Sequence, residues 1–244
     1  MIMNKIYVVG MGPGKEEGMT RQAYEALEES EIIIGYPVYL ELLPNAFSSK
    51  EKLGTPMKKE VERCRICIEK ALEGRIVSMV CSGDAGVYGM ASLILELLED
   101  RDDVEVCIVP GVTAALSGAA VLGAPLSHDF CVISLSDLLT PYELIMDRVR
   151  YAAKAGFVMA IYNPSSRKRS DYLKNACDIL LEELSGDTVC GYVENIGREG
   201  EKAVVCTLRE LRDTSVNMFT TVFVGNKTTR NIAGRMVTKR GYDV

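Results

Sequence analysis

The sequence has a single histidine, His128, and no apolar run near the roughly 18–20 residues that cross a bilayer. With one histidine and no second cysteine pair, Cys64-x-x-Cys67 lacks the partners of a zinc site, and we interpret both cysteines as core-facing helix positions. Net positive charge is also absent, because the formal charge is −6. No signal-peptide pattern precedes the strand that begins at Lys5. We expect a soluble, cytoplasmic protein with reduced thiols, no bound metal and no nucleic-acid or membrane partner.

What the sequence does contain is a regular alternation of apolar runs and helical patterns in its first half. Strands are predicted at 5–10, 31–36, 75–83 and 104–111, and helices at 20–30, 58–74, 88–100 and 112–123. Thr20 stands at the N-cap position of the first helix. Continuous Val/Ile runs separated by helices are typical of a parallel sheet that is covered on both faces.

The second half has a different pattern, because its late strands follow one another through short polar connections. Strands are predicted at 130–137, 157–164, 188–196, 201–211 and 219–226, and helices at 141–156 and 170–184. Part of this sheet is therefore expected to be antiparallel. We assign the chain to the α/β class with two α/β domains: residues 1–122 with a mostly parallel sheet and residues 123–244 with a mixed sheet.

The first strand ends in a Gly-rich turn that fits neither of two common nucleotide motifs. A dinucleotide fingerprint, G-x-G-x-x-G, fits Gly10 and Gly12 but fails at Lys15. A P-loop fits Gly14-Lys15 but fails at Glu16. A turn whose glycines tolerate positive φ is one interpretation. Gly-rich loops at strand ends of such sheets usually face a ligand, which favours a binding role.

Three further strand ends carry loops of the same kind. They read CSGDAGVYG at 81–89, VPGVTAA at 109–115 and YNPSSRKRS at 162–170. Asp84 offers a carboxylate acceptor, and Thr113 opens a helix where its hydroxyl can cap the helix or contact a ligand. Each loop alone is explained by turn geometry, but the four loops together, on successive strand ends of one sheet, are expected to form one site.

These loops, in this order, resemble those of the tetrapyrrole methylase family, whose members use S-adenosylmethionine. The resemblance spans nearly the whole chain and rests on VVGMGPGKEEGMT, SGDAGVYGMA, PGVTAALSGAA, IYNPSSRKR, VENIGREGE and FTTVFVGNKTTR. Within the family, GYPVYLELL, SGDAGVYGMA and SLSDLLTPYE are similar to the branch that methylates C-17 of a precorrin in cobalamin biosynthesis.

The resemblance implies that S-adenosylmethionine lies folded in a cleft between the two domains. It assigns cofactor contacts to eleven positions: Pro13, Ser82, Gly83, Asp84, Val87, Tyr88, Thr113, Ala114, Tyr162, Asn163 and Ile196. Ala85 is a departure from the family pattern, because many relatives have proline there. The departure leaves the acceptor Asp84 in place.

Methyl transfer from a sulfonium to a pyrrole carbon requires alignment more than a strong base. Contraction of the macrocycle, which the resemblance also implies, requires proton transfer. We assign His128 and Ser127 as catalytic candidates, with Ser134 and Ser136 in the same segment. A hydrogen-bonded, inert loop histidine is the alternative for His128.

A precorrin carries many carboxylates, which arginine side chains bind in bidentate geometry. This acidic chain supplies local cations in two places, at 167–169 and at Lys227, Arg230 and Arg235. We assign substrate contacts to Gly12, Gly14, Arg167, Arg169 and Arg230. A solvated basic loop is the alternative for each cation.

The resemblance implies a homodimeric enzyme that methylates C-17 of cobalt-precorrin-3, or of precorrin-3B, and contracts the ring to (cobalt-)precorrin-4. Three alternatives stay open at this point. They are methylation of another precorrin position, methylation of a protein side chain, and a non-catalytic tetrapyrrole-binding protein.

Overall fold

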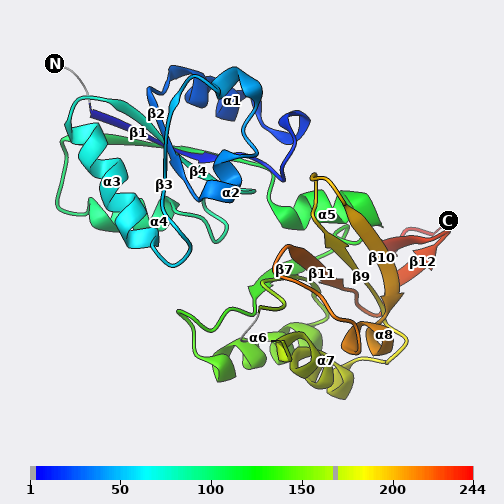
Figure 1. Cartoon of the computed structure of the whole chain (residues 1–244). Coiled ribbons are helices and arrows are strands. Elements are labelled where there is room, and N and C mark those ends of the chain that lie inside the picture. The colour runs from blue at the N-terminus through cyan, green and yellow to red at the C-terminus, as the bar shows by residue number, and fades with distance from the viewer. Residues whose placement is uncertain (1–3, 167–169, 244) are drawn as a thin grey trace. The chain divides into compact units, whose positions relative to one another are not determined.

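A computed structural model of the chain describes residues 4–166 and 170–243 (Figure 1). The chain divides into two compact units, Met1–Thr113 and Ala114–Val244. The division lies nine residues before the boundary expected after residue 122. The reason is that helix α5 (Ala114–Leu122) packs against the sheet of the second unit, where Ala115, Ala119 and Leu122 are buried.

The first unit is built on a five-stranded parallel sheet with the strand order β3-β2-β4-β1-β5. Its strands are β1 (Asn4–Gly10), β2 (Ile32–Gly35), β3 (Glu51–Gly54), β4 (Ile76–Cys81) and β5 (Val104–Val109). Its helices are α1 (Arg21–Glu29), α2 (Pro37–Leu40), α3 (Glu60–Leu72) and α4 (Ala91–Leu97), with short 3-10 turns at Glu16–Gly18 and Asn45–Phe47. The predicted parallel sheet is confirmed, and strand β3 is an addition that the sequence pattern did not predict.

Both faces of this sheet are covered, as predicted. Ile6 and Val8 of β1 point to the face that carries α3 and α4, and Val9 points to the opposite face under α1. Cys64 and Cys67 of α3 are fully buried in the first of these two clusters. The interpretation of the C-x-x-C pair as core-facing helix positions is therefore confirmed.

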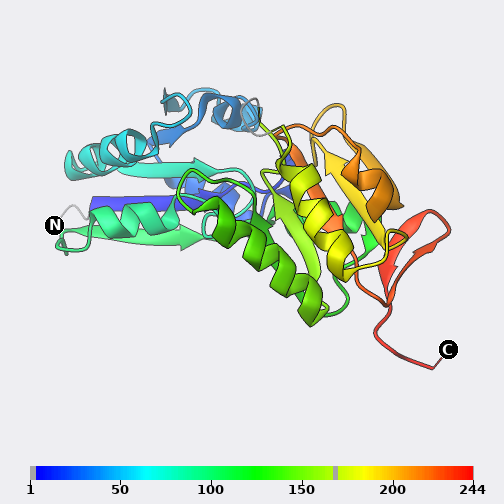
Figure 2. The ribbon, with the colours of Figure 1, turned by 90° about the horizontal axis from the view of Figure 1, so that it is seen from below.

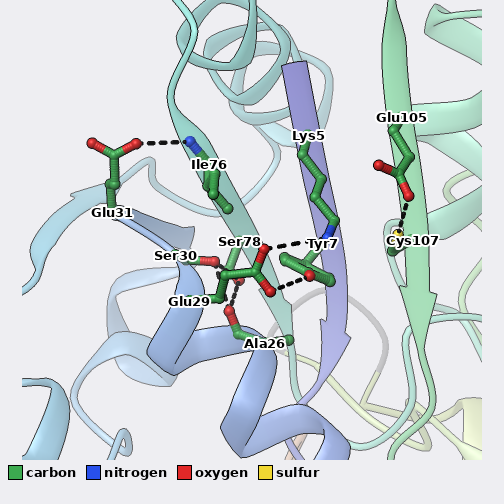
Figure 3. Close-up of polar contacts among 10 residues, drawn as sticks. All are labelled: Lys5, Tyr7, Ala26, Glu29, Ser30, Glu31, Ile76, Ser78, Glu105 and Cys107. Atoms are coloured by element: carbon green, nitrogen blue, oxygen red, sulfur yellow. Dashed lines mark hydrogen bonds and ion pairs between the residues drawn. The ribbon is translucent and has the colours of Figure 1, made fainter. Parts of the chain in front are cut away.

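Side-chain hydrogen bonds are present at both ends of helix α1. Thr20 caps its start, because the Thr20 side chain accepts a hydrogen bond from the Ala23 amide at 3.1 Å, as predicted. At its other end Glu29 accepts from the Tyr7 hydroxyl at 2.5 Å and from the Lys5 ammonium at 3.2 Å (Figure 3). These contacts join α1 to the amino-terminal half of β1.

The second unit has a mixed five-stranded sheet with the strand order β10-β9-β11-β8-β7. Its strands are β7 (Phe130–Ser134), β8 (Val158–Tyr162), β9 (Val189–Glu194), β10 (Lys202–Thr207) and β11 (Thr220–Val224). Strands β7 and β8 are parallel and are joined by α6 (Tyr142–Ala155), whereas the other pairs are antiparallel. Helix α7 (Tyr172–Glu183) packs against α6. The predicted mixed sheet is confirmed.

Two features of this unit differ from the prediction. The strand predicted over 201–211 ends at Thr207, and helix α8 (Leu208–Arg212) follows, because Thr207 and Glu210 form a capping box that starts a helix there. A small unpredicted sheet contains β12 (Thr229–Ile232), β13 (Arg235–Thr238) and β6 (Gly123–Ala124). Figure 2 shows its hairpin in red at the edge of the second unit.

Candidate functional site

Three loops meet at the carboxyl edge of the parallel sheet in the first unit. Strands β1, β4 and β5 end in register there, since Gly10 pairs with Cys81 and Val9 with Val109. Beyond the strand ends the backbones of Gly12 and Gly83 exchange two hydrogen bonds, of 3.0 and 2.8 Å. The predicted loops after β1 and β4 are thus a single hydrogen-bonded structure.

Glycine is required at the centre of this structure because the backbones approach so closely. A Cβ on Gly10 would lie 2.7 Å from the Gly111 nitrogen and 2.8 Å from the Gly83 oxygen. A Cβ on Gly111 would lie 2.1 Å from the Gly83 oxygen. These glycines permit contact between the loops. Sequence reasoning missed Gly111, although its place after a strand-ending proline was a signal.

The Asp84 carboxylate joins two of these loops. Its Oδ1 accepts hydrogen bonds from the amides of Gly86 at 2.8 Å and Val87 at 3.0 Å. Its Oδ2 accepts from the Gly111 amide at 2.9 Å. A carboxylate has about four acceptor sites, so about one of them is left for a ligand. Asp84 therefore holds the loops together whether or not it also touches a cofactor.

The other predicted cofactor positions of this unit surround the same loops. Pro13 follows Gly12, and Ser82 precedes Gly83. Tyr88 has a left-handed backbone with φ of 55° and is exposed. Thr20, which was predicted only as a helix cap, also donates a hydrogen bond to the Pro110 carbonyl at 3.2 Å. The Thr20 hydroxyl thus connects the start of α1 to the loop after β5.

The expectation that all four loops lie on one sheet is wrong, because the loop after β8 belongs to the sheet of the second unit. In that unit, residues at the carboxyl ends of β7 and β8 form another polar group. The Tyr162 hydroxyl accepts a hydrogen bond from the Ala115 amide at 2.6 Å, directly after the predicted Thr113 and Ala114. Asn163 donates from Nδ2 to the Ser134 hydroxyl at 2.9 Å. The fold therefore brings the loop after β8 to the first turn of α5, two regions that are far apart in sequence.

Three predicted positions make none of these hydrogen bonds. Ile196 lies in the hydrophobic core, where a Cβ on Gly118 of α5 would come within 2.9 Å of its Cδ1. His128 and Ser127 precede β7, at the opposite end of the strand from Ser134. Phe130 and Ser134 are four residues apart, which corresponds to about 13 Å along a strand. The structure does not bring His128 and Ser127 to Tyr162.

His128 has a local role in the segment before β7. Its Nδ1 accepts a hydrogen bond from the Asp129 amide at 2.8 Å. The Ser127 hydroxyl donates to the Ala124 carbonyl at 3.1 Å. Both contacts are within the turn itself, as expected for the alternative of an inert loop histidine.

The predicted substrate cations are distributed unevenly. Arg167 and Arg169, with Lys168 between them, lie outside the described residues. Arg230 lies on β12, and its Nη1 donates to the carbonyls of Lys227 and Thr229, each at 2.8 Å. Gly12 and Gly14 have positive φ angles of 76° and 159°. The φ of Gly12 lies in the left-handed region that favours glycine, so the turn after β1 requires glycine at this position.

The described part of the chain, residues 4–166 and 170–243, has no group of three or more His, Cys, Asp or Glu side chains placed to hold a metal ion. In the same residues, the helices are all too short or too polar to span a membrane.

Comparisons with known proteins identify the class to which this arrangement belongs. The family model of the Tetrapyrrole (Corrin/Porphyrin) Methylases matches residues 5–212. The chain is 46% identical over 236 residues to the probable cobalt-factor III C(17)-methyltransferase of Salmonella typhimurium, which covers 96% of this chain and 98% of that protein. The chain therefore belongs to the tetrapyrrole methylases, and the resemblance inferred from the loops is confirmed.

Solved structures give the same fold. The crystal structure of the methyltransferase CobJ has a TM-score of 0.88 at 37% identity and covers 96% of this chain and 99% of that one. A uroporphyrin-III C-methyltransferase from Thermus thermophilus, solved as a complex with S-adenosyl homocysteine, has a TM-score of 0.72 at 24% identity. It covers 91% of this chain and 97% of its own, and at this identity it supports the fold alone.

Proposed function

We propose that this chain is an S-adenosylmethionine-dependent methyltransferase that methylates C-17 of cobalt-precorrin-3, or of precorrin-3B, with contraction of the ring to (cobalt-)precorrin-4. The observation that carries the proposal is the 46% identity, over nearly the full length of both chains, to a protein named as a C(17)-methyltransferase. The polar groups at the carboxyl ends of the parallel strands support it, because ligands of α/β sheets bind at such edges.

The residues of the first unit fit the proposed cofactor. Glycines let the loops after β1, β4 and β5 come close enough for backbone contact, and Asp84 retains about one free acceptor site for a ligand hydroxyl. The proposed contacts in this unit are Pro13, Ser82, Gly83, Asp84, Val87, Tyr88 and Thr113. In the second unit they are Ala114, Tyr162 and Asn163. When bound, S-adenosylmethionine supplies an electrophilic methyl group.

The role of the protein in this reaction is to orient the reactants. In-line methyl transfer needs alignment of the reactants, which can contribute about 7–11 kcal/mol to lowering the barrier. The loops are suited to this role because three amides fix the Asp84 carboxylate and the Ala115 amide fixes the Tyr162 hydroxyl.

The test is incubation with cobalt-precorrin-3 and S-adenosylmethionine labelled with ¹³C in the methyl group, followed by NMR and mass analysis of the product. The proposal requires one labelled methyl group at C-17. A label at another ring position would establish the first alternative, and a labelled protein the second. Binding of the tetrapyrrole without formation of S-adenosylhomocysteine would establish a non-catalytic carrier.

The proposal includes a homodimer, which the family resemblance implies, and a cytoplasmic location. Sedimentation velocity on the purified chain tests the dimer. A monomer that turns over at the full rate would remove the homodimer from the proposal and leave the reaction unchanged.

A further inference from the structure

Arg63 is a buried arginine without a carboxylate partner among the described residues. It lies near the start of α3 and is 5% exposed. Its Nε donates to the Thr55 hydroxyl at 3.0 Å, and its Nη2 donates to the carbonyls of Thr55 and Pro56 at 3.0 and 3.1 Å. All three contacts are to neutral oxygens. A buried guanidinium is normally paired with an acid, because an unpaired buried charge is costly.

The acids next to Arg63 in the sequence have other partners. Glu60 accepts from the Lys58 amide at 3.0 Å, and Glu62 pairs with the Lys59 ammonium at 3.0 Å. The third guanidinium nitrogen, Arg63 Nη1, donates to no described residue. Among the described residues, Glu105 Oε2 is the one side-chain nitrogen or oxygen that is both buried and unpaired, so Nη1 retains access to solvent.

The loop held by Arg63 lies at the carboxyl edge of the parallel sheet. The loop that it holds, residues 55–59, follows β3, and the ends of β3 and β2 are in register at Gly54 and Gly35. All strands of this sheet are parallel, so this loop lies at the same edge as the Asp84 loop. Two strand spacings separate β3 from β4, which is about 10 Å.

We propose that Arg63 binds a carboxylate of the tetrapyrrole substrate through Nη1, while Nε and Nη2 hold residues 55–56 in place. The proposal rests on the proposed function for the nature of the ligand. A tetrapyrrole carries carboxylate arms around a flat ring, and a guanidinium forms strong, directional hydrogen bonds with a carboxylate. A cation at this distance from the cofactor loops orients the ring without touching the reacting carbon.

The test measures binding of a carboxylate-rimmed porphyrin, uroporphyrin III, by titration of its Soret absorbance at low and high salt. Arg63→Gln is expected to weaken porphyrin binding roughly tenfold or more, since a hydrogen bond to a charged group is lost. Arg63→Lys keeps the charge and loses the planar fork, so its affinity is expected to lie between those of Arg63→Gln and the unaltered chain. The affinity for S-adenosylhomocysteine, measured by calorimetry, is expected to change by less than about twofold, since Arg63 lies outside the Asp84 loop.

Arg65→Gln is the matched control, because Arg65 is exposed on the same helix two residues further on. It is expected to bind the porphyrin like the unaltered chain. A lower unfolding midpoint with unchanged porphyrin affinity in both Arg63 variants would overturn the proposal and leave Arg63 as a loop-holding residue only. If Arg63→Gln does not fold, the Arg63→Lys variant and the salt dependence of binding decide the question, since loss of the fork alone must weaken binding.

The porphyrin titration requires no turnover. The proposed reaction and the proposed carboxylate site at Arg63 can therefore be rejected independently of each other. Porphyrin binding that depends on Arg63, together with no methyl transfer to cobalt-precorrin-3, would reject the reaction and keep the carboxylate site. Methyl transfer with an unchanged KM for cobalt-precorrin-3 in the Arg63 variants would keep the reaction and reject the site.

Discussion

At the scale of the residue, Asp84 shows how one side chain can determine the form of a site. Its two oxygens accept hydrogen bonds from three amides, one of which, the Gly111 amide, lies 27 residues from Asp84 in the sequence. The carboxylate thereby satisfies donors that would otherwise be unpaired at the ends of β4 and β5. A residue of this kind affects stability and ligand affinity together.

We expect Asp84→Asn to lower both quantities. Its side chain keeps one carbonyl oxygen and so cannot accept from both loops, which leaves at least one amide unsatisfied. Each lost bond to a charged acceptor corresponds to about 1.5–3 kcal/mol. Urea unfolding without ligand measures the stability, and calorimetry with S-adenosylhomocysteine measures the affinity. Lower affinity at unchanged stability would show that the ligand, not Gly111, is the main partner of Asp84.

At the scale of the element, β1 and α1 are joined by the contacts of Glu29 with Tyr7 and Lys5 (Figure 3). The hydrogen bond from Tyr7, and then the Lys5 ammonium, lower the pKa of Glu29 below its ordinary value of 4.5. A lowered pKa in the folded state means that the contact stabilises the fold above pH 4.5. This contribution is lost as the pH falls through the folded-state value.

Glu29→Gln is therefore expected to lower the free energy of unfolding at pH 7 by about 0.5–1 kcal/mol, the range for an ion pair that is partly exposed. The difference from the unaltered chain should be smaller at pH 3 than at pH 7. Urea unfolding at the two pH values measures it. Glu28→Gln, on the exposed side of the same helix, is the control and should change neither value. An equal loss at pH 3 would show that the charge of Glu29 is not the cause.

The two ends of β7 have different expected roles. Ser134 lies at the carboxyl end beside Asn163, whereas His128 precedes the amino end and contacts the amide of its own neighbour. We expect His128→Ala to retain methyl transfer within about twofold, as for a surface position outside the site. Tyr162→Phe, which removes the acceptor of the Ala115 amide, is expected to weaken S-adenosylhomocysteine binding. A large loss of kcat in His128→Ala at unchanged cofactor affinity would assign His128 to the reaction.

At the scale of the whole molecule, each unit has its own hydrophobic core with buried cysteines. Burial raises the pKa of the Cys64 thiol of the first unit to about 12 and that of the Cys177 thiol of the second unit to about 12. Because the thiolate is the reactive form, both thiols react slowly in the folded chain at neutral pH. The cysteines therefore act as reporters of the unfolding of each unit.

We expect iodoacetamide at pH 8 to label Cys64 and Cys177 only when urea unfolds the unit that contains them. Mass analysis of the peptides at increasing urea concentration measures the labelling of each unit separately. Labelling of both at one urea concentration would show that the units unfold together. Rapid labelling of Cys64 without urea would contradict the buried position found here.

The sequence by itself determined the elements and the class of the fold. Val/Ile runs between amphipathic helices predicted the parallel sheet of the first unit, and short connections predicted the antiparallel pairs of the second, because these patterns express local burial. The Gly-rich pattern also placed the loops around Gly12, Gly83 and Tyr162 at the carboxyl ends of strands, which the structure confirms for β1, β4 and β8. The short edge strand β3 and helix α8 were missed, since four or five residues carry too little periodicity.

Only the tertiary structure decided which residues meet. The bond from Gly111 to Asp84 depends on two strands that flank β1, and the bond from Ala115 to Tyr162 depends on the packing of α5 on the second sheet. The burial of Arg63 and the separation of His128 from Ser134 depend in the same way on the order and direction of strands. Contacts of this kind result from packing between segments that are distant in the sequence, so a local pattern of residues does not predict them.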